Sequence, residues 1–307
     1  MKTRFRRVGL ALAVTAFALM AWEARGQDLE PRTYSNIPVG LNFLIAGYGY
    51  SAGGVVTDPS FPLEDGDVQI HSTVLAYAHA VDVWGTSGKF DVVLPFAWAS
   101  GTATFRGQPR AREVSGLADP RFRFSVNLYG APALSLQEFA DYKQDLIIGA
   151  SLQVSAPLGQ YDSSKLLNIG TNRWSIKPEV GVSKALGPLT LELAAGVTFY
   201  TKNDDFLSGM TLEQDPIYSV QGHLIYNFGA GVWGALDATY YTGGRTTVDG
   251  VKGDNLQENT RLGVTLALPV NRHNSIKLYG STGVFARTGS NFNTGGIAWQ
   301  FRWGGGL

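Results

Sequence analysis

Residues 40–303 consist mainly of short segments in which apolar and polar residues alternate. The clearest one, Arg121–Tyr129, reads Arg-Phe-Arg-Phe-Ser-Val-Asn-Leu-Tyr. Successive side chains of an extended strand point to opposite faces, so this segment has one apolar face and one polar face. About a dozen such segments follow one another, separated by glycine-rich turns or polar loops, as is typical of a transmembrane β-barrel.

We therefore predict an all-β fold, an antiparallel transmembrane β-barrel of about twelve strands with short periplasmic turns and longer outer loops. An even number of strands returns the chain to the periplasmic side. The predicted strands span residues 40–50, 68–80, 89–103, 120–129, 145–156, 173–184, 189–200, 217–228, 232–242, 256–268, 276–287 and 292–303.

Three short links support this assignment, because a hairpin must bring side chains of one face opposite each other. The three-residue link pairs Phe228 with Val232, and the seven-residue link pairs Leu268 with Ile276, all on the apolar face. The four-residue turn after residue 184 sets Ser183 beside Thr190 on the polar face. All three links agree in parity.

Two local features depart from plain strands and turns. Residues 135–138, Ser-Leu-Gln-Glu, fit a capping box and predict one short helix at the lower rim, with a plug as the alternative. Pro178 and Pro95 lie within predicted strands, where proline removes a ladder hydrogen bond. We predict a bulge or an interrupted pair at each.

The N-terminus predicts export. Residues 1–7 carry four basic side chains, and the thirteen residues Val8–Met20 are apolar or small, too few for the roughly 20 that span a bilayer. We predict a secretory signal peptide at residues 1–26 and a single outer-membrane β-barrel domain at 27–307. The predicted location is the outer membrane of a Gram-negative bacterium, after export through the inner membrane.

The composition of the chain limits the kinds of binding partner that we expect. Residues 1–26 hold five of the 25 basic residues and one of the 25 acidic residues, which leaves 20 and 24. This mature chain has no basic surplus, so we expect no nucleic acid partner. Cysteine is absent, which excludes disulfides and thiolate metal sites. The expected partners are outer-membrane lipid and lipopolysaccharide, with no cofactor.

Three stretches resemble a known family. Residues 115–122 read Ser-Gly-Leu-Ala-Asp-Pro-Arg-Phe, residues 156–162 read Ala-Pro-Leu-Gly-Gln-Tyr-Asp, and residues 168–178 read Asn-Ile-Gly-Thr-Asn-Arg-Trp-Ser-Ile-Lys-Pro. They resemble the family of outer-membrane proteins named for the meta-pathway of phenol degradation, over nearly all of the mature chain. Ala118 stands where that family commonly has glycine. The resemblance implies a transporter-like barrel linked by name to aromatic compound uptake.

The polar faces of the predicted strands supply the candidate functional residues. Gln69, His71, Gln153, Gln221, Asn259 and Gln300 are neutral members of this set. The charged lumen-lining candidates are Asp91, Arg121, Arg123, Lys177, Glu179, Glu192, His223, Asp237, Arg261, Lys277 and Arg302. Both signs of charge occur, so the lumen is no simple attractor of one ion type.

Two functions fit such a lumen. The first is passive passage of small, aromatic or hydrophobic solutes through an outer-membrane channel, which a twelve-stranded barrel would leave narrow. The alternative is a closed structural or interaction barrel whose lumen is filled by paired side chains.

Aromatic residues gather near strand ends, as interfacial girdles do. The girdles are the better explanation; the alternative is a track that stacks on aromatic solutes, for which Tyr129, Tyr200 and Tyr279, expected to point inward, are the best candidates. Trp299, Phe301 and Trp303 share one face of the last strand, which we expect the barrel-assembly machinery to bind.

No sequence feature predicts an enzyme. The chain has no Gly-x-Ser-x-Gly motif, and its four histidines lack the spacing of a helical zinc site. The acidic clusters at 64–67 and 203–205 could hold calcium, but solvated loops explain them better. We expect no catalytic residues and no metal site.

Overall fold

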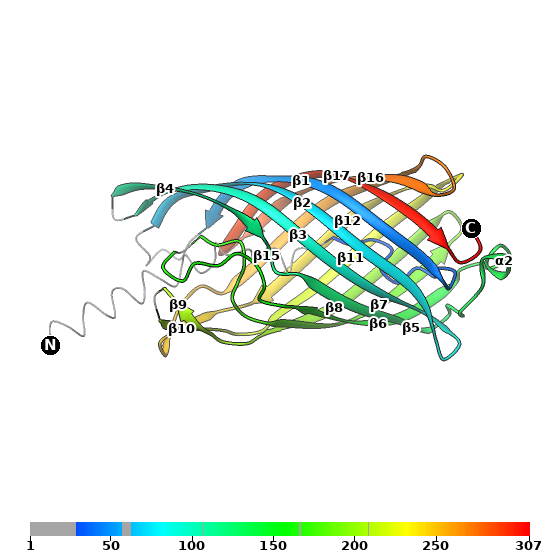
Figure 1. Ribbon diagram of the computed structural model, residues 1–307, viewed down its shortest axis with the longest axis horizontal. Helices are drawn as coiled ribbons and strands as arrows, with labels where there is room; N and C mark the ends of the chain where they lie inside the picture. The colour runs from blue at the N-terminus through cyan, green and yellow to red at the C-terminus, as the bar shows by residue number, and fades with distance from the viewer. Residues whose placement is uncertain (1–28, 57–62, 106, 166, 208) are drawn as a thin grey trace.

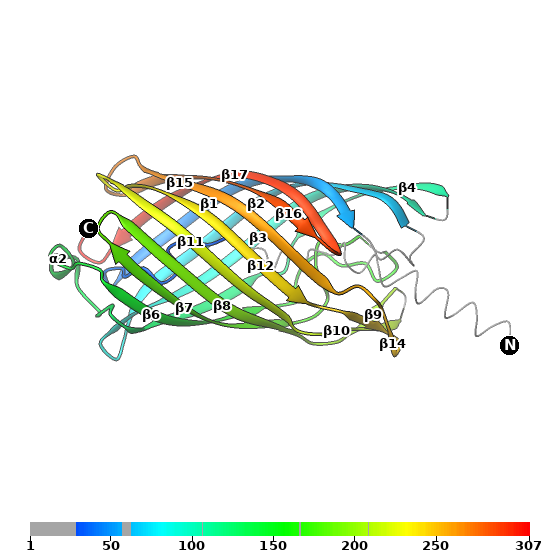
Figure 2. The same cartoon turned by 180° about the vertical axis from the view of Figure 1, so that it is seen from behind.

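The structure is a computed structural model, and it describes residues 29–56, 63–105, 107–165, 167–207 and 209–307. The predicted signal peptide and its cleavage site lie outside the described residues. The strands run obliquely around one elongated barrel (Figure 1), and the view from behind shows the wall continuing on the far side (Figure 2). Helix α2 and the C-terminus lie at one end, and β4, β9 and β10 lie at the other.

Twelve antiparallel strands of the described residues form the barrel wall, as predicted. Neighbours follow the order β2, β1, β17, β16, β15, β12, β11, β8, β7, β6, β5, β3, and pairing between β2 and β3 closes the ring. The strands are β1 (Leu41–Val56), β2 (Leu63–Val83), β3 (Thr86–Phe105), β5 (Arg121–Tyr129), β6 (Leu146–Ser155), β7 (Ser175–Leu186), β8 (Leu189–Tyr200), β11 (Ile217–Gly229), β12 (Val232–Gly243), β15 (Gln257–Pro269), β16 (Asn274–Ala286) and β17 (Gly289–Gly304).

Five further strands were not predicted, and all belong to the outer loops. They are β4 (Gln108–Leu117), β9 (Asn203–Phe206), β10 (Met210–Gln214), β13 (Thr246–Val248) and β14 (Val251–Lys252). β4 pairs with the outer end of β3, while the other four form a separate sheet. The buried side chains of Phe206, Leu212 and Val248 pack together in that sheet. β9, β10, β13 and β14 have at most five residues each, and strands this short carry too few alternating positions to be recognised from sequence.

The periplasmic turns are tighter than predicted, which shifts two of the three tested hairpin registers. Leu268 pairs with Ile276 as expected. In the β7–β8 hairpin Leu186 pairs with Leu189, so the register slides by an even number of residues and Ser183 keeps its predicted face. In the β11–β12 hairpin Gly229 pairs with Val232, and a register shift displaces Phe228 from the pairing predicted for it.

The turn between β2 and β3 is also short, although its sequence contains a tryptophan. Val83 pairs with Thr86, and both central residues have positive φ, 53° at Trp84 and 84° at Gly85. Two-residue hairpin loops favour such primed turns because their twist matches that of the strands. Trp84 is 99% exposed at this tip.

The predicted irregularities occur at the expected places. Helix α2 (Leu136–Phe139) begins with the Ser135–Glu138 capping box. The Ser135 hydroxyl and amide both donate to the Glu138 carboxylate, and these bonds lower the pKa of Glu138. Pairing between β7 and β8 is interrupted beside Pro178, as predicted. Pro95 pairs with β2 and lies where β3 changes partner from β5 to β4.

Large apolar side chains cover the outside of the barrel. Leu193 is 59% exposed and Leu236 is 60% exposed, and both alternate with buried neighbours along their strands. Among the described residues, no helix is long and apolar enough to cross a bilayer. The alternation along the strands places these apolar side chains on the outward face, which is the surface that contacts lipid.

The outward face predicts a depth-dependent cost for a buried charge. Leu193→Arg, in the middle of β8, should lower the free energy of unfolding in lipid vesicles by about 2–4 kcal/mol. Leu128→Arg, near the periplasmic end of β5, is the matched control and should cost about 0–1 kcal/mol. Urea titration followed by heat-modifiable gel mobility measures both, and equal costs would contradict the lipid-facing assignment.

Candidate functional site

The strand register determines which side chains face the barrel interior. Arg123 lies opposite Asp91 on β3 and opposite Gln153 on β6, so these three share the inner face. Following the register around the ring puts every charged candidate on that face. They are Asp91, Arg121, Arg123, Lys177, Glu179, Glu192, His223, Asp237, Arg261, Lys277 and Arg302.

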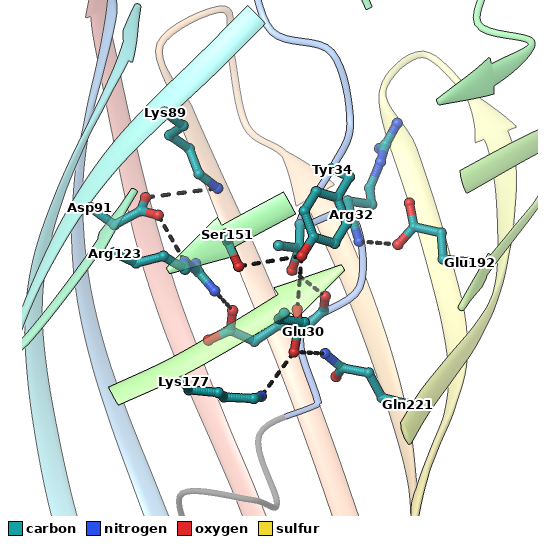
Figure 3. Close-up of polar contacts among 12 residues, drawn as sticks. Glu30, Arg32, Tyr34, Lys89, Asp91, Arg123, Ser151, Lys177, Glu192 and Gln221 are labelled. Atoms are coloured by element: carbon teal, nitrogen blue, oxygen red, sulfur yellow. Dashed lines mark hydrogen bonds and ion pairs between the residues drawn. The ribbon is translucent and has the colours of Figure 1, made fainter. Parts of the chain in front are cut away.

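The chain before β1 lies inside the barrel. Residues 29–40, called the N-terminal segment from here on, run past the inner wall (Figure 3). The Arg32 amide donates to the Glu192 carboxylate at 2.7 Å. The Tyr34 hydroxyl donates to the Glu179 carboxylate at 3.1 Å. Carboxylates from β7 and β8 therefore hold this segment in the lumen.

Glu30 of the N-terminal segment belongs to a network of paired charges. Its carboxylate pairs with the Arg123 guanidinium, whose Nε also donates to Asp91 at 3.0 Å. The Lys89 ammonium lies 3.7 Å from the other oxygen of Asp91. Two cations thus face two carboxylates, and one of those carboxylates belongs to the N-terminal segment.

The Tyr34 ring packs against two inward glycines. The ring lies over Gly149 of β6 and Gly181 of β7, and a Cβ atom at either position would overlap it. Tyr34 is 4% exposed. Glycine inside a strand often marks a place where another part of the chain approaches closely. These two glycines therefore explain why the segment packs against β6 and β7.

A small polar cleft adjoins the segment. The Lys177 ammonium lies 2.9 Å from Glu179, and the Gln221 amide donates to the same carboxylate at 3.2 Å. The side chains that line the cleft are Glu30, Arg123, Ser151, Gln153, Lys177, Glu179 and Gln221. Charges of both signs are paired across this part of the lumen.

Three further inward charges lie on β11, β12 and β15. His223 Nδ1 lies 2.7 Å from Asp237, which also accepts a hydrogen bond from the Thr265 hydroxyl at 2.9 Å. Arg261 donates to the Ser281 hydroxyl at 3.0 Å. We call the inner faces of β5 to β8, β11, β12 and β15 the charged wall.

The opposite side of the lumen is lined differently. The register continues the inner face onto β17, β1, β2 and β3, where a run of inward residues is small or apolar, while Lys89 and Asp91 of β3 and Gln300 and Arg302 of β17 are polar inward residues nearer the periplasmic end. This apolar wall comprises Ile45, Gly47, Gly49, Val74, Ala76, Ala78, Val93, Pro95, Ala97, Gly296 and Ala298, with Ser72 among them. The lumen therefore has a charged side and an apolar side.

The strand register contradicts the prediction that Gln69 and His71 face the lumen. Both were expected to face the lumen, but the register places Ile70 inward and His71 opposite the exposed Trp98 on the outside. The His71 ring contacts Tyr48, with Nδ1 at 2.6 Å from the hydroxyl. Because β2 carries apolar residues on both faces, alternation alone could not show which face is inward. Gln153, Gln221, Asn259 and Gln300 do face the lumen.

The inward aromatic set also changes. Tyr129 was expected inside, but a register shift before it sets it opposite the outward Ile148, and it is 60% exposed. Tyr200 and Tyr279 lie on the inner face as expected. Trp233 lies inside as well, and the Arg32 guanidinium sits 5.1 Å from its ring centre.

The motif stretches that suggested a family form a brace between outer loops. Asp119, before β5, accepts hydrogen bonds from the Gly159 amide at 2.9 Å and from the Thr171 hydroxyl at 2.6 Å. The Arg173 guanidinium stacks 4.6 Å from the Tyr200 ring centre. These residues fix the loops that precede β5 and β7, so the motif has a structural role.

One part of the site was missed from sequence. The N-terminal segment lacks the alternating pattern, so Glu30, Arg32 and Tyr34 were not considered. The sequence signal that could have revealed the segment was the inward position of Gly149 and Gly181, since each interrupts an otherwise substituted inner face.

Among the described residues, no group of three or more histidine, aspartate or glutamate side chains is placed to hold a metal ion.

Comparison with known proteins agrees with this architecture. The family described as "Putative MetA-pathway of phenol degradation" matches residues 46–302. An outer membrane channel from Pseudomonas putida F1 has a similar structure, with a TM-score of 0.76 at 22% identity, covering 90% of this chain and 100% of that one.

Autotransporter barrels are more distant. The transport unit of AIDA-I from Escherichia coli gives a TM-score of 0.56 at 9% identity, covering 94% of this chain and 98% of that one. The β domain of Brka from Bordetella gives 0.52 at 10% identity, with coverages of 86% and 100%. No curated protein matches the chain in sequence.

The packing of the Tyr34 ring against Gly149 and Gly181 predicts how firmly the N-terminal segment is held. Tyr34→Ala should speed hydrogen exchange of the Arg32 amide by at least about tenfold, because the segment loses a buried ring and its bond to Glu179. Ser35→Ala, one residue away, is the control and should leave exchange unchanged. Equal protection in both variants would show that the ring does not hold the segment.

Proposed function

The chain belongs to the family of the MetA-pathway of phenol degradation, and we propose that it is an outer-membrane channel for passive passage of small aromatic or hydrophobic solutes. One observation carries this proposal, the division of the lumen into a charged wall and an apolar wall. The N-terminal segment is bonded to the charged wall, as the contacts of Glu30, Arg32 and Tyr34 show. Solutes would pass beside it, along the apolar wall.

The chemistry of the apolar wall fits such solutes. Ile45, Val74 and Val93 are only partly buried, so water of the lumen reaches them. Covering apolar surface with an apolar solute is favourable by roughly 25 cal/mol per Å², and small side chains leave room for a ring. A sugar or an ion would gain nothing comparable there. The similar structure from Pseudomonas putida F1 is described as an outer membrane channel, which supports the proposal.

The alternative function is a closed structural or interaction barrel. The N-terminal segment inside the lumen favours this alternative, because its ion pairs brace the wall from within. It accounts less well for the apolar wall, since a barrel filled by paired side chains has no use for small inward residues opposite them. Transport measurements separate the two functions.

Location and assembly complete the proposal. We place the protein in the outer membrane, with residues 1–26 as the export signal and residues 27–307 as one barrel domain in contact with lipid and lipopolysaccharide. The ring centres of Trp299 and Phe301 are 6.1 Å apart, and those of Phe301 and Trp303 are 5.5 Å apart. This aromatic row on β17 is the proposed contact for the assembly machinery. The proposal includes no catalytic activity.

The function predicts an unusual order of permeation. In a liposome swelling assay, purified protein should admit phenyl β-D-glucoside at least as fast as the smaller methyl β-D-glucoside, because only the phenyl ring gains contact with the apolar wall. A folded barrel, verified by heat-modifiable gel mobility, is the required control. Entry ordered by size would contradict an apolar path, and no entry of either glucoside would favour the closed barrel.

A further inference from the structure

The outer end of the apolar wall is covered by part of the loop between β6 and β7. Residues 167–171 of that loop are called the cap from here on, and their Ile169 side chain packs in one cluster with the inward Ala97 and Ala99 of β3. Ile169 is 1% exposed, and Ala97 is fully buried. Val93, four residues before Ala97 on the same face of β3, is only partly buried. The cap therefore lies where the open part of the wall ends.

The strand register explains why apolar side chains of the cap fit there. Ile70 of β2, Ala99 of β3 and Val114 of β4 lie opposite one another across three neighbouring strands. The side chains of Ile70 and Val114 pack against the same cluster. The next inward residue of β3 is Gly101, and a Cβ atom there would lie 3.3 Å from Leu167 Cδ2. Small residues on β3 thus admit two large side chains of the cap.

Hydrogen bonds fix the cap in this position. The Asp119 carboxylate accepts a hydrogen bond from the Thr171 amide at 3.0 Å and another from the Thr171 hydroxyl at 2.6 Å. The Arg112 guanidinium donates to the Leu167 carbonyl at 2.8 Å. These bonds lie on both sides of Ile169 in the chain, so its side chain is held against the wall.

We propose that Ile169 limits the size of the solutes that enter the apolar path, an inference that rests on the proposed channel function. Solutes that follow the apolar wall from the outside meet the cap first, and they pass beside Ile169 before they reach Val93. A single aromatic ring passes this point, and a fused two-ring system is retarded. Because the cap is fixed, the limit depends on the volume of the side chain at position 169.

The alternative role for Ile169 is to anchor the loop. In that case the side chain only keeps the loop attached to β3, and its volume does not select solutes. The two roles differ when the side chain is made larger. A larger side chain narrows the entrance if it limits solute size, but it loosens a close-packed cluster if it is only an anchor. Substitutions in both directions therefore separate the two roles.

The experiment measures the uptake of phenyl and 2-naphthyl β-D-glucosides into vesicles that contain the purified mature protein, after subtraction of the uptake by protein-free vesicles. The two glucosides share the sugar and differ by one fused ring. Ile169→Ala should raise the naphthyl-to-phenyl rate ratio about tenfold, the lower end of the discrimination that a methylene-sized change gives in an apolar pocket. Ile169→Phe should lower the ratio, because the larger side chain narrows the entrance further. Ile169→Val should give a smaller rise, and it decides the matter should Ile169→Ala not fold.

Controls keep the outcomes distinct. Leu158→Ala removes a side chain that is 70% exposed on the same loop, and it should leave the ratio unchanged. Heat-modifiable gel mobility verifies that each variant is folded. An unchanged ratio in folded Ile169→Ala, or a rise in both Ile169→Ala and Ile169→Phe, would overturn the size limit. If the wild type still admits phenyl β-D-glucoside, the proposed function survives that result. If the folded wild type admits neither glucoside, the channel function itself fails.

Discussion

Closure of the sheet is the constraint on which the rest of the structure depends. Pairing of β2 with β3 joins the two ends of the strand order, so every wall strand is bonded on both sides. Alternate residues of each strand are then committed to the lumen, because the side-chain period of a strand is two. The composition of the lumen follows directly: most inward charges lie on one arc, the charged wall, and small apolar residues lie on the other, the apolar wall, while Lys89, Asp91, Lys277 and Arg302 are inward charges outside the charged wall.

The charged arc explains the position of the N-terminal segment. Among the residues that the structure describes, Arg123 and Lys89 share one wall carboxylate, that of Asp91. Glu30 supplies a second carboxylate from the segment, and charges in a narrow lumen are stabilised when paired. Gly149 and Gly181 then admit Tyr34. The segment is held on one side, and the apolar arc stays in contact with lumen water.

The wall could be predicted from sequence because its signal is local and repeated. Strand identity, strand number and the inward parity of Arg121, Glu192 and Lys277 all follow from alternation. The pattern failed where both faces of a strand are apolar, as at His71, and where a bulge changes the parity, as at Tyr129. It could not reveal the seat of Tyr34, which depends on contacts between residues more than a hundred positions apart.

The central claim is that solutes use the apolar arc. Its most direct test is the ratio of swelling rates for phenyl and methyl β-D-glucosides in Ile45→Asn/Val74→Asn, which makes the arc polar with nearly the same number of side-chain heavy atoms. The account predicts that the phenyl preference of the wild type disappears while the methyl rate is retained. An unchanged preference in the folded variant would contradict it.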